Sequence, residues 1–115
     1  MESRTTKALR LLGLARRAGG VAPGTEAVRR AIRMGEARLI LIAADASSVQ
    51  VEKVRTTLHD RPIPQVILGD RDALGTAVGL APLSAVAVTH AAIAEELARE
   101  FSDSGGECSA DVVEA

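Results

Sequence analysis

Aromatic residues are almost absent from this chain of 115 residues, which has no tryptophan, no tyrosine and a single phenylalanine, Phe101. The hydrophobic core must therefore be aliphatic. RNA-binding domains that stack bases on a sheet need exposed aromatic side chains, so this mode of recognition is excluded. Any binding of nucleic acid has to depend on guanidinium groups, backbone amides and shape.

Cysteine and long apolar runs are also scarce. Cys108 is the only cysteine, so no internal disulfide can form, which suits a reducing compartment. The longest apolar run, residues 39–44 (LILIAA), is far too short to span a bilayer, and the first residues lack the apolar core of a signal peptide. We therefore expect a cytoplasmic protein with no membrane partner.

Groups that could carry catalysis or hold a metal ion are few. His59 and His90 have no cysteine or acidic residue at the spacing of a metal site, and no serine stands in a nucleophile elbow. Asp45 ends a predicted strand as a phospho-acceptor would, but without an earlier acidic pair it is interpreted as an acceptor for loop amides. We expect no enzyme activity, no cofactor and no metal. A small enzyme stays an alternative that would require a convergent set of titratable groups.

Apolar periodicity and turn residues predict alternating helices and strands, and therefore an α/β fold with helices on both faces of a small mixed sheet of about four strands. The predicted helices span residues 5–18, 25–34, 47–59, 70–79 and 90–101, and the predicted strands span residues 21–22, 38–45, 63–69 and 83–89. We expect one domain, residues 1–101, followed by a disordered acidic tail, residues 102–115.

Basic residues are concentrated in the first third of the sequence. The segment that ends at Arg38 has a net charge of +6, and the rest has a net charge of −7. Within that segment Arg16 and Arg17 precede a glycine-rich turn, which is followed by three further arginines, Arg29, Arg30 and Arg33. Free amides at the helix start beside Gly24 would attract an anion, with Arg16 and Arg17 closing the other side. The alternative is an ordinary solvated surface on which Glu26 and Arg30 form an i, i+4 ion pair.

Three segments of the sequence together resemble a known family. They are LLGLARRAGG (residues 11–20), GTEAVRRAIRMGEARLILIAAD (residues 24–45) and ALGTAVGLAPLSAVAV (residues 73–88). Their order and spacing resemble the kink-turn-binding ribosomal proteins, the superfamily of the archaeal large-subunit protein seven-Ae and the eukaryotic large-subunit protein thirty. Within it the chain is most similar to the bacterial YlxQ-like members. The resemblance covers residues 5–97 and implies a three-layer α-β-α sandwich.

The resemblance also implies a binding mode, in which the start of the second helix reads guanine edges in a sharply bent RNA with tandem G·A pairs. The family pattern Gly-Thr-Asn-Glu-x-x-Lys corresponds here to Gly24, Thr25, Glu26, Ala27, Val28, Arg29 and Arg30. The arginine replaces the lysine with its charge kept, but the asparagine position is Glu26. A carboxylate can only accept hydrogen bonds from guanine, whereas an amide can also donate.

A second contact region is implied in the loop before the last strand, which holds a flipped-out nucleotide in the family. Leu83 and Ser84 fall in this loop, and the resemblance places Ser47 and Val51 in the same pocket. Without the resemblance, all four residues are interpreted as ordinary packing.

These observations predict an RNA-binding, ribosome-associated protein that recognises a kinked, G·A-rich RNA without catalysis. Its expected partners are kink-turn or ribosomal RNA and the ribosome or translation factors, with no DNA specificity. The alternative is a protein-interaction module of the same fold, acting in translation or ribosome assembly with an altered RNA site.

Overall fold

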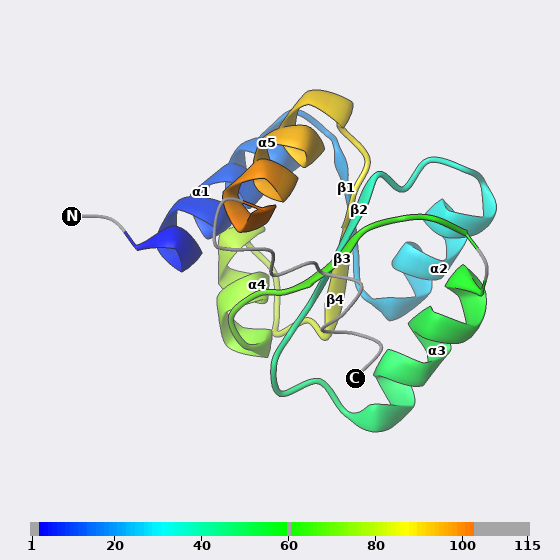
Figure 1. Ribbon diagram of the computed structural model, residues 1–115. Coiled ribbons are helices and arrows are strands. Elements are labelled where there is room, and N and C mark those ends of the chain that lie inside the picture. Colours follow the sequence, from blue (N-terminus) through cyan, green and yellow to red (C-terminus); the bar gives the residue numbers. More distant parts are fainter. Residues whose placement is uncertain (1–2, 60, 103–115) are drawn as a thin grey trace.

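The computed structural model describes residues 3–59 and 61–102 (Figure 1). Of the predicted tail only Ser102 falls within them. The helices are α1 (Arg4–Arg17), α2 (Thr25–Arg33), α3 (Ser48–Leu58), α4 (Arg71–Ala77) and α5 (Ala91–Ser102), and the strands are β1 (Val21–Pro23), β2 (Leu39–Ile42), β3 (Gln65–Ile67) and β4 (Ala85–Val88). The predicted order of elements is confirmed, with the last three strands shorter than predicted.

The four strands form one mixed sheet in the order β1-β4-β2-β3. β4 pairs antiparallel with both β1 and β2, so that Ala87 lies opposite Ala22 on one side and Ile40 on the other, whereas β2 and β3 pair in parallel. β1, β2 and β3 therefore run in the same direction, and β4 runs against them. The predicted small mixed sheet is confirmed.

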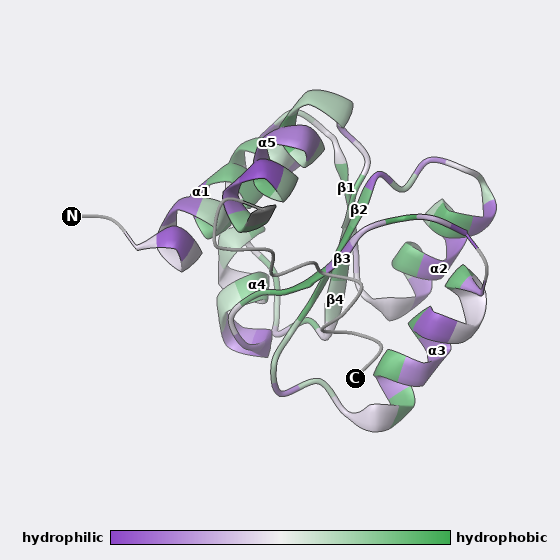
Figure 2. Ribbon diagram, in the orientation of Figure 1, coloured by the Kyte–Doolittle hydropathy of each residue, from purple (hydrophilic) through white to green (hydrophobic). Residues whose placement is uncertain are grey.

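Successive side chains of the sheet point into two separate cores. Figure 1 shows α1, α4 and α5 on one face of the sheet and α2 and α3 on the other. Residues Leu39, Leu41, Val86 and Val88 belong to the first core, and residues Ile40, Ile42, Ala85 and Ala87 belong to the second. Every residue of β2 and β4 is buried, and Figure 2 shows these two strands as hydrophobic beside helices with mixed faces. The α-β-α sandwich is confirmed, because only strands covered on both faces have this pattern.

Side-chain caps determine where four of the helices begin. Ser3, Ser47 and Asp70 each accept a hydrogen bond from the main-chain N–H three residues further along, and His90 Nδ1 accepts in the same way from the Ile93 N–H before α5, at 3.3 Å. Such caps satisfy amides that the helix itself leaves unpaired. α2 differs, because its N-cap is Gly24, which has no side chain that could accept a hydrogen bond.

The common direction of β1, β2 and β3 gives the sheet two functionally different sides. The carboxyl side, where these three strands end, consists of Gly24, residues 43–47, residues 68–70 and residues 83–84. The amino side, where they begin, consists of residues 18–20, 34–38, 59, 61–64 and 89–90. Main-chain hydrogen bonds join the carboxyl side: the N–H of Gly24 donates to Ala85, that of Ala43 to Ser84 and that of Ala44 to Gly69, over 2.8–2.9 Å.

Candidate nucleic-acid interface

The start of α2 lies open on the carboxyl side. Gly24 has φ 97°, a conformation that favours glycine, and its carbonyl accepts the first helical hydrogen bond from Val28 at 2.9 Å. No side chain caps the first turn, so its amide donors and the positive end of the helix dipole are available to an anion.

The loop before β4 packs against this helix start. A Cβ at Gly24 would lie 3.9 Å from the Cδ2 atom of Leu83, and the N–H of Leu83 donates to the carbonyl of Arg71 at 3.1 Å. Leu83 and Ser84 are both half-buried. The structure therefore brings these two predicted site residues beside Gly24 and Thr25, from about sixty residues away in the sequence.

Ser47 and Val51 lie further along the same side, at the start of α3. The Ser47 hydroxyl accepts a hydrogen bond from the Gln50 N–H at 3.3 Å and so caps the helix. Val51 is half-buried and packs against the core beneath α2 and α3. In the free protein, Ser47 therefore caps α3 and Val51 contributes to the core. The contact of either residue with a nucleotide stays a prediction.

Asp45 joins the end of β2 to the start of α4. Its Oδ1 atom accepts a hydrogen bond from the Arg71 main-chain N–H at 2.9 Å, and its Oδ2 atom lies 3.4 Å from Arg71 Nε. The Arg71 amide, followed by its guanidinium, lowers the pKa of the Asp45 carboxyl. This interaction stabilises the fold above the normal carboxyl pKa and is lost as the pH falls through the lowered one. The interpretation of Asp45 as an acceptor for loop amides is confirmed.

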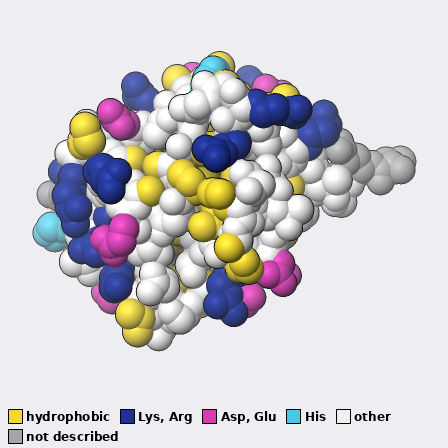
Figure 3. Space-filling view, turned by 180° about the vertical axis from the view of Figure 1, so that it is seen from behind, with side chains coloured by type: hydrophobic (Ala, Val, Ile, Leu, Met, Phe, Trp, Pro, Cys, Tyr) yellow, Lys and Arg dark blue, Asp and Glu magenta, His cyan; other side chains and the backbone are white. Residues whose placement is uncertain are grey.

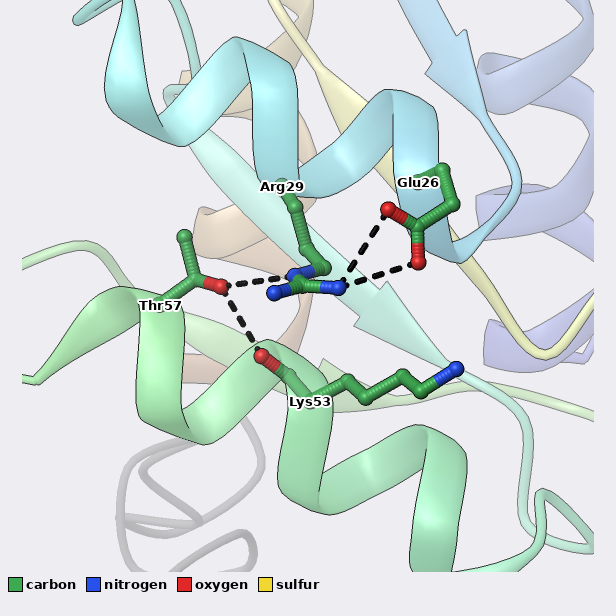
Figure 4. A network of polar contacts seen from close by, with 4 residues as sticks. All are labelled: Glu26, Arg29, Lys53 and Thr57. Carbon is green, nitrogen blue, oxygen red and sulfur yellow. Dashed lines mark hydrogen bonds and ion pairs between the residues drawn. The ribbon is translucent and has the colours of Figure 1, made fainter.

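A polar network links the first turn of α2 to α3 (Figure 4). Arg29 Nη1 lies 3.0 and 3.3 Å from the two carboxylate oxygens of Glu26, and Arg29 Nε donates to the Thr57 hydroxyl at 3.0 Å. That hydroxyl donates in turn to the main-chain carbonyl of Lys53 at 2.9 Å. Arg29 is therefore fixed between two helices, and its charge offsets that of Glu26.

The Glu26–Arg30 ion pair of the alternative interpretation is not formed, because Glu26 pairs with Arg29 one position earlier. The hydrogen bond to the Thr57 hydroxyl holds the Arg29 side chain against α3. Glu26 lies on the same face of α2 and pairs with Arg29 there. Arg30 is exposed and makes no side-chain hydrogen bond or ion pair within residues 3–59 and 61–102. It is therefore free to reach a ligand at the helix start. Sequence reasoning missed Thr57, because nothing in the local pattern connects it to a residue 28 positions away.

A pocket of about 550 Å³ lies beside this network, between α2 and α3. It is lined by Arg29, Ser48, Val49, Glu52, Lys53 and Thr56. The pocket is shallow and its lining carries charges of both signs. It extends the surface of the carboxyl side along α3. Sequence patterns do not indicate this pocket, since residues of two separate helices form it.

Arg16 and Arg17 do not close the other side of the α2 start. They end α1, so they lie at the amino side, and α1 and α2 cover opposite faces of the sheet. Arg16 Nε donates to the carbonyl of Val78 at the end of α4, at 3.3 Å. Arg33 ends α2 and also lies toward the amino side. The expectation of two arginine pairs facing each other across one turn is wrong, because β1 separates them.

Residues 6–98 match the Ribosomal protein L7Ae/L30e/S12e/Gadd45 family, which covers most of the chain. The chain belongs to this family. The RNA-binding protein YlxQ of Bacillus subtilis is 37% identical over 87 residues, which are 76% of this chain and 87% of that protein. The large ribosomal subunit protein eL8 of Thermoplasma volcanium is 33% identical over 97 residues, which are 84% of this chain and 80% of its own. The family resemblance predicted from the three sequence segments is confirmed.

Two solved structures place this L7Ae/L30e family member among known folds. A protein of unknown function from Bacillus halodurans superposes with a TM-score of 0.77 at 31% identity, over 84% of this chain and 97% of that one. The Giardia lamblia 15.5kD RNA binding protein superposes with a TM-score of 0.71 over 90% of this chain and 89% of its own. At 23% identity the second likeness supports the fold alone.

Within residues 3–59 and 61–102, no group of three His, Cys, Asp or Glu side chains could hold a metal ion. Among the described helices, none is both long and apolar enough to cross a membrane. Cys108 and most of the predicted tail lie outside the described residues.

Proposed function

We propose that this protein binds RNA at a kink-turn and holds it in its bent form, without catalysing a reaction. The observation that carries the proposal is the uncapped start of α2 at Gly24, with Leu83 packed against it and Arg30 free beside it. Family membership supports the proposal, as do relatives named for RNA binding and for the large ribosomal subunit. We accordingly place the protein in the cytoplasm, at the ribosome or with translation factors.

Each part of the helix start has a distinct task in this proposal. The amides of the first turn donate to a phosphate, and the helix dipole adds partial positive charge. Arg30, one and a half turns on, reaches a guanine edge or a second phosphate with its planar donor set. Leu83 and Ser84 cover an unstacked nucleotide from the opposite side. Arg29 offsets the Glu26 charge and so limits its repulsion of the backbone.

A protein-interaction module is the second candidate. The observation that favours it is the acidic character of the carboxyl side, where Asp45, Asp70 and Asp72 accompany Glu26. Such a surface repels a phosphate backbone more than a uniformly basic one would. In that case a protein partner would be retained after RNase treatment and would not depend on Arg30.

A gel-shift titration at physiological salt separates the two candidates. It compares a standard kink-turn RNA with the same RNA whose tandem G·A pairs are replaced by Watson–Crick pairs. We expect the first RNA to bind more tightly by roughly tenfold or more, and Arg30→Gln to remove the preference. Arg99→Gln on α5 is the matched control for loss of one exposed charge. Equal, weak binding of both RNAs would contradict kink-turn recognition and favour the protein-interaction module.

A further inference from the structure

The topology collects arginines at the amino side of the sheet. α1, α2 and α3 directly precede β1, β2 and β3 in turn, so the three parallel strands bring the three helix ends to one side. The last turn of each helix carries basic residues, which interact favourably with the negative end of a helix dipole. These residues are Arg16 and Arg17 in α1, Arg33 in α2 and Arg55 in α3, while Arg30, nearly one turn before the end of α2, is assigned to the proposed site at the helix start.

Main-chain hydrogen bonds make the amino side one continuous surface. The N–H of Thr89 donates to Gly20 at 2.7 Å, and the N–H of Arg38 donates to Val88 at 2.9 Å. Farther along, the Arg61 guanidinium donates to the carbonyl of Ile32 near the end of α2. The surface therefore runs from the end of α1 across the sheet to the connection between α3 and β3, and it adds Arg38 and Arg61 to the helix ends.

Several of these guanidinium groups have no partner in the described structure. Arg16 and Arg61 each donate to a main-chain carbonyl near a helix end. The others are exposed and make no side-chain hydrogen bond or ion pair within residues 3–59 and 61–102: these are Arg17, Arg33, Arg38 and Arg55. Figure 3 shows Lys and Arg side chains gathered over the upper and left parts of the molecule, where the histidines also lie.

The positive charge exceeds what the helix ends require. Six arginines stand at or beside the amino side, and the described residues of the connections that form it contain one acidic residue, Glu36. Each helix end contributes about half a negative charge. The three helix ends together therefore offset less than half of the net positive charge that the arginines leave on this side. The carboxyl side has the opposite balance, because Asp45, Asp70 and Asp72 outnumber Arg71 there.

We propose that the amino side is a second RNA-binding surface, which takes the phosphate backbone of a duplex segment. All six basic groups are guanidinium groups, whose planar donors match phosphate oxygens. They are spread along the sheet instead of converging on a pocket, which fits a row of phosphates better than a single small anion. The surface has no Phe, Tyr or Trp side chain, and its guanidinium contacts to phosphates position RNA without reading sequence.

This second surface lies across the sheet from the start of α2. The protein is then able to hold a kink-turn at its carboxyl side and a separate duplex at its amino side, and so to fix one RNA segment relative to another. The inference does not depend on recognition of the kink, because backbone contacts alone carry it.

The full chain is first saturated with unlabelled kink-turn RNA. A labelled RNA duplex without G·A pairs is then added, and its binding is measured by fluorescence anisotropy at several salt concentrations. The test variant is Arg33→Gln with Arg38→Gln, two exposed side chains without a described partner. The matched control is Arg4→Gln with Arg99→Gln, which removes the same charge at the N-terminal turn of α1 and the last turn of α5. Circular dichroism confirms that all proteins are folded.

We expect the wild type and the control to bind the duplex alike. In the test variant the slope of log affinity against log salt concentration should be smaller by about two, and affinity for the duplex should fall by roughly tenfold. Affinity for the kink-turn RNA alone should stay unchanged. An equal loss in the control and the test variant, or no duplex binding to the saturated wild type, would overturn the second surface.

Failure of the proposed function gives a different result. If the wild type does not distinguish the kink-turn from its Watson–Crick version, kink-turn recognition is contradicted, and the duplex titration is then run on the free protein. A selective loss in the Arg33→Gln, Arg38→Gln variant would still support the amino side as an RNA surface. No difference between that variant and the control would overturn it.

Discussion

Glu26 stands where α2 begins, and two thirds of its side chain is exposed there (66%). Its carboxylate is held by Arg29, which is itself held by Thr57 on α3. In the proposed complex, residue 26 therefore presents to the RNA acceptor oxygens whose charge is offset at one side only. A guanine can donate to these oxygens, but a phosphate or a guanine O6 atom is repelled by them.

Replacement of Glu26 by asparagine should tighten binding to a standard kink-turn RNA by roughly tenfold, because it removes a negative charge and supplies an amide donor. Arg29 keeps its hydrogen bond to Thr57 in this variant, so the helix pair stays joined. The measurement is the dissociation constant from gel-shift titration. Glu26→Gln removes the same charge on a longer side chain, and separates the loss of charge from the position of the amide. Unchanged or weaker binding of Glu26→Asn would mean that residue 26 does not face guanine.

α4 and the loop that follows it touch backbone to backbone at Gly75. A Cβ on this buried residue would lie 2.4 Å from the carbonyl oxygen of Ala81 and 2.8 Å from that of Leu80. The Gly75 carbonyl also accepts a hydrogen bond from the Leu80 N–H at 2.8 Å. The path of this loop determines where Leu83 packs against the start of α2. Because Gly75 has no side chain, the loop can approach α4 closely, and Gly75 thereby affects the position of Leu83 without contacting it.

Gly75→Ala should lower the free energy of unfolding by roughly 1–3 kcal/mol, because neither backbone segment can move without loss of hydrogen bonds. Urea denaturation measures this change. Kink-turn affinity should fall as well, because the displaced loop carries Leu83 away from Gly24. Thr76→Ala, at the exposed neighbouring position, is the control and should change stability by less than about 0.5 kcal/mol. A fully stable Gly75→Ala protein would show that the loop is free to move aside.

The helices were predictable because their caps and periodicity are local, and so was the burial of the central strands. The lengths of the strands were less predictable. Ala43 and Ala44 continue the apolar run of β2 and form main-chain hydrogen bonds, yet they lie beyond the paired residues Leu39–Ile42. The position of Arg16 and Arg17 was not predicted, since it depends on β1 separating the end of α1 from the start of α2 and on these helices covering opposite faces of the sheet (Figure 1). The Glu26–Arg29–Thr57 network likewise requires knowledge of which helices become neighbours.

The whole molecule consists of two cores divided by a sheet only one strand thick. Leu12 of α1 is fully buried in one core and Ile32 of α2 in the other. Close packing within each core couples neighbouring side chains, but the sheet backbone lies between the two sets. The surface at the start of α2 therefore depends directly on the second core, and the end of α1 depends on the first.

Leu12→Ala should destabilise the protein by about 2–5 kcal/mol and Ile32→Val by about 0.5–1.5 kcal/mol. Because helices on opposite faces of the sheet do not touch, the double variant should show the sum to within about 0.5 kcal/mol. Urea denaturation of the four proteins gives the coupling directly. Leu12→Ala should also leave kink-turn affinity unchanged wherever the protein is folded, since α2 packs on the other face. A larger coupling would mean that the sheet transmits strain between its faces, and that the two proposed RNA surfaces are energetically linked through it.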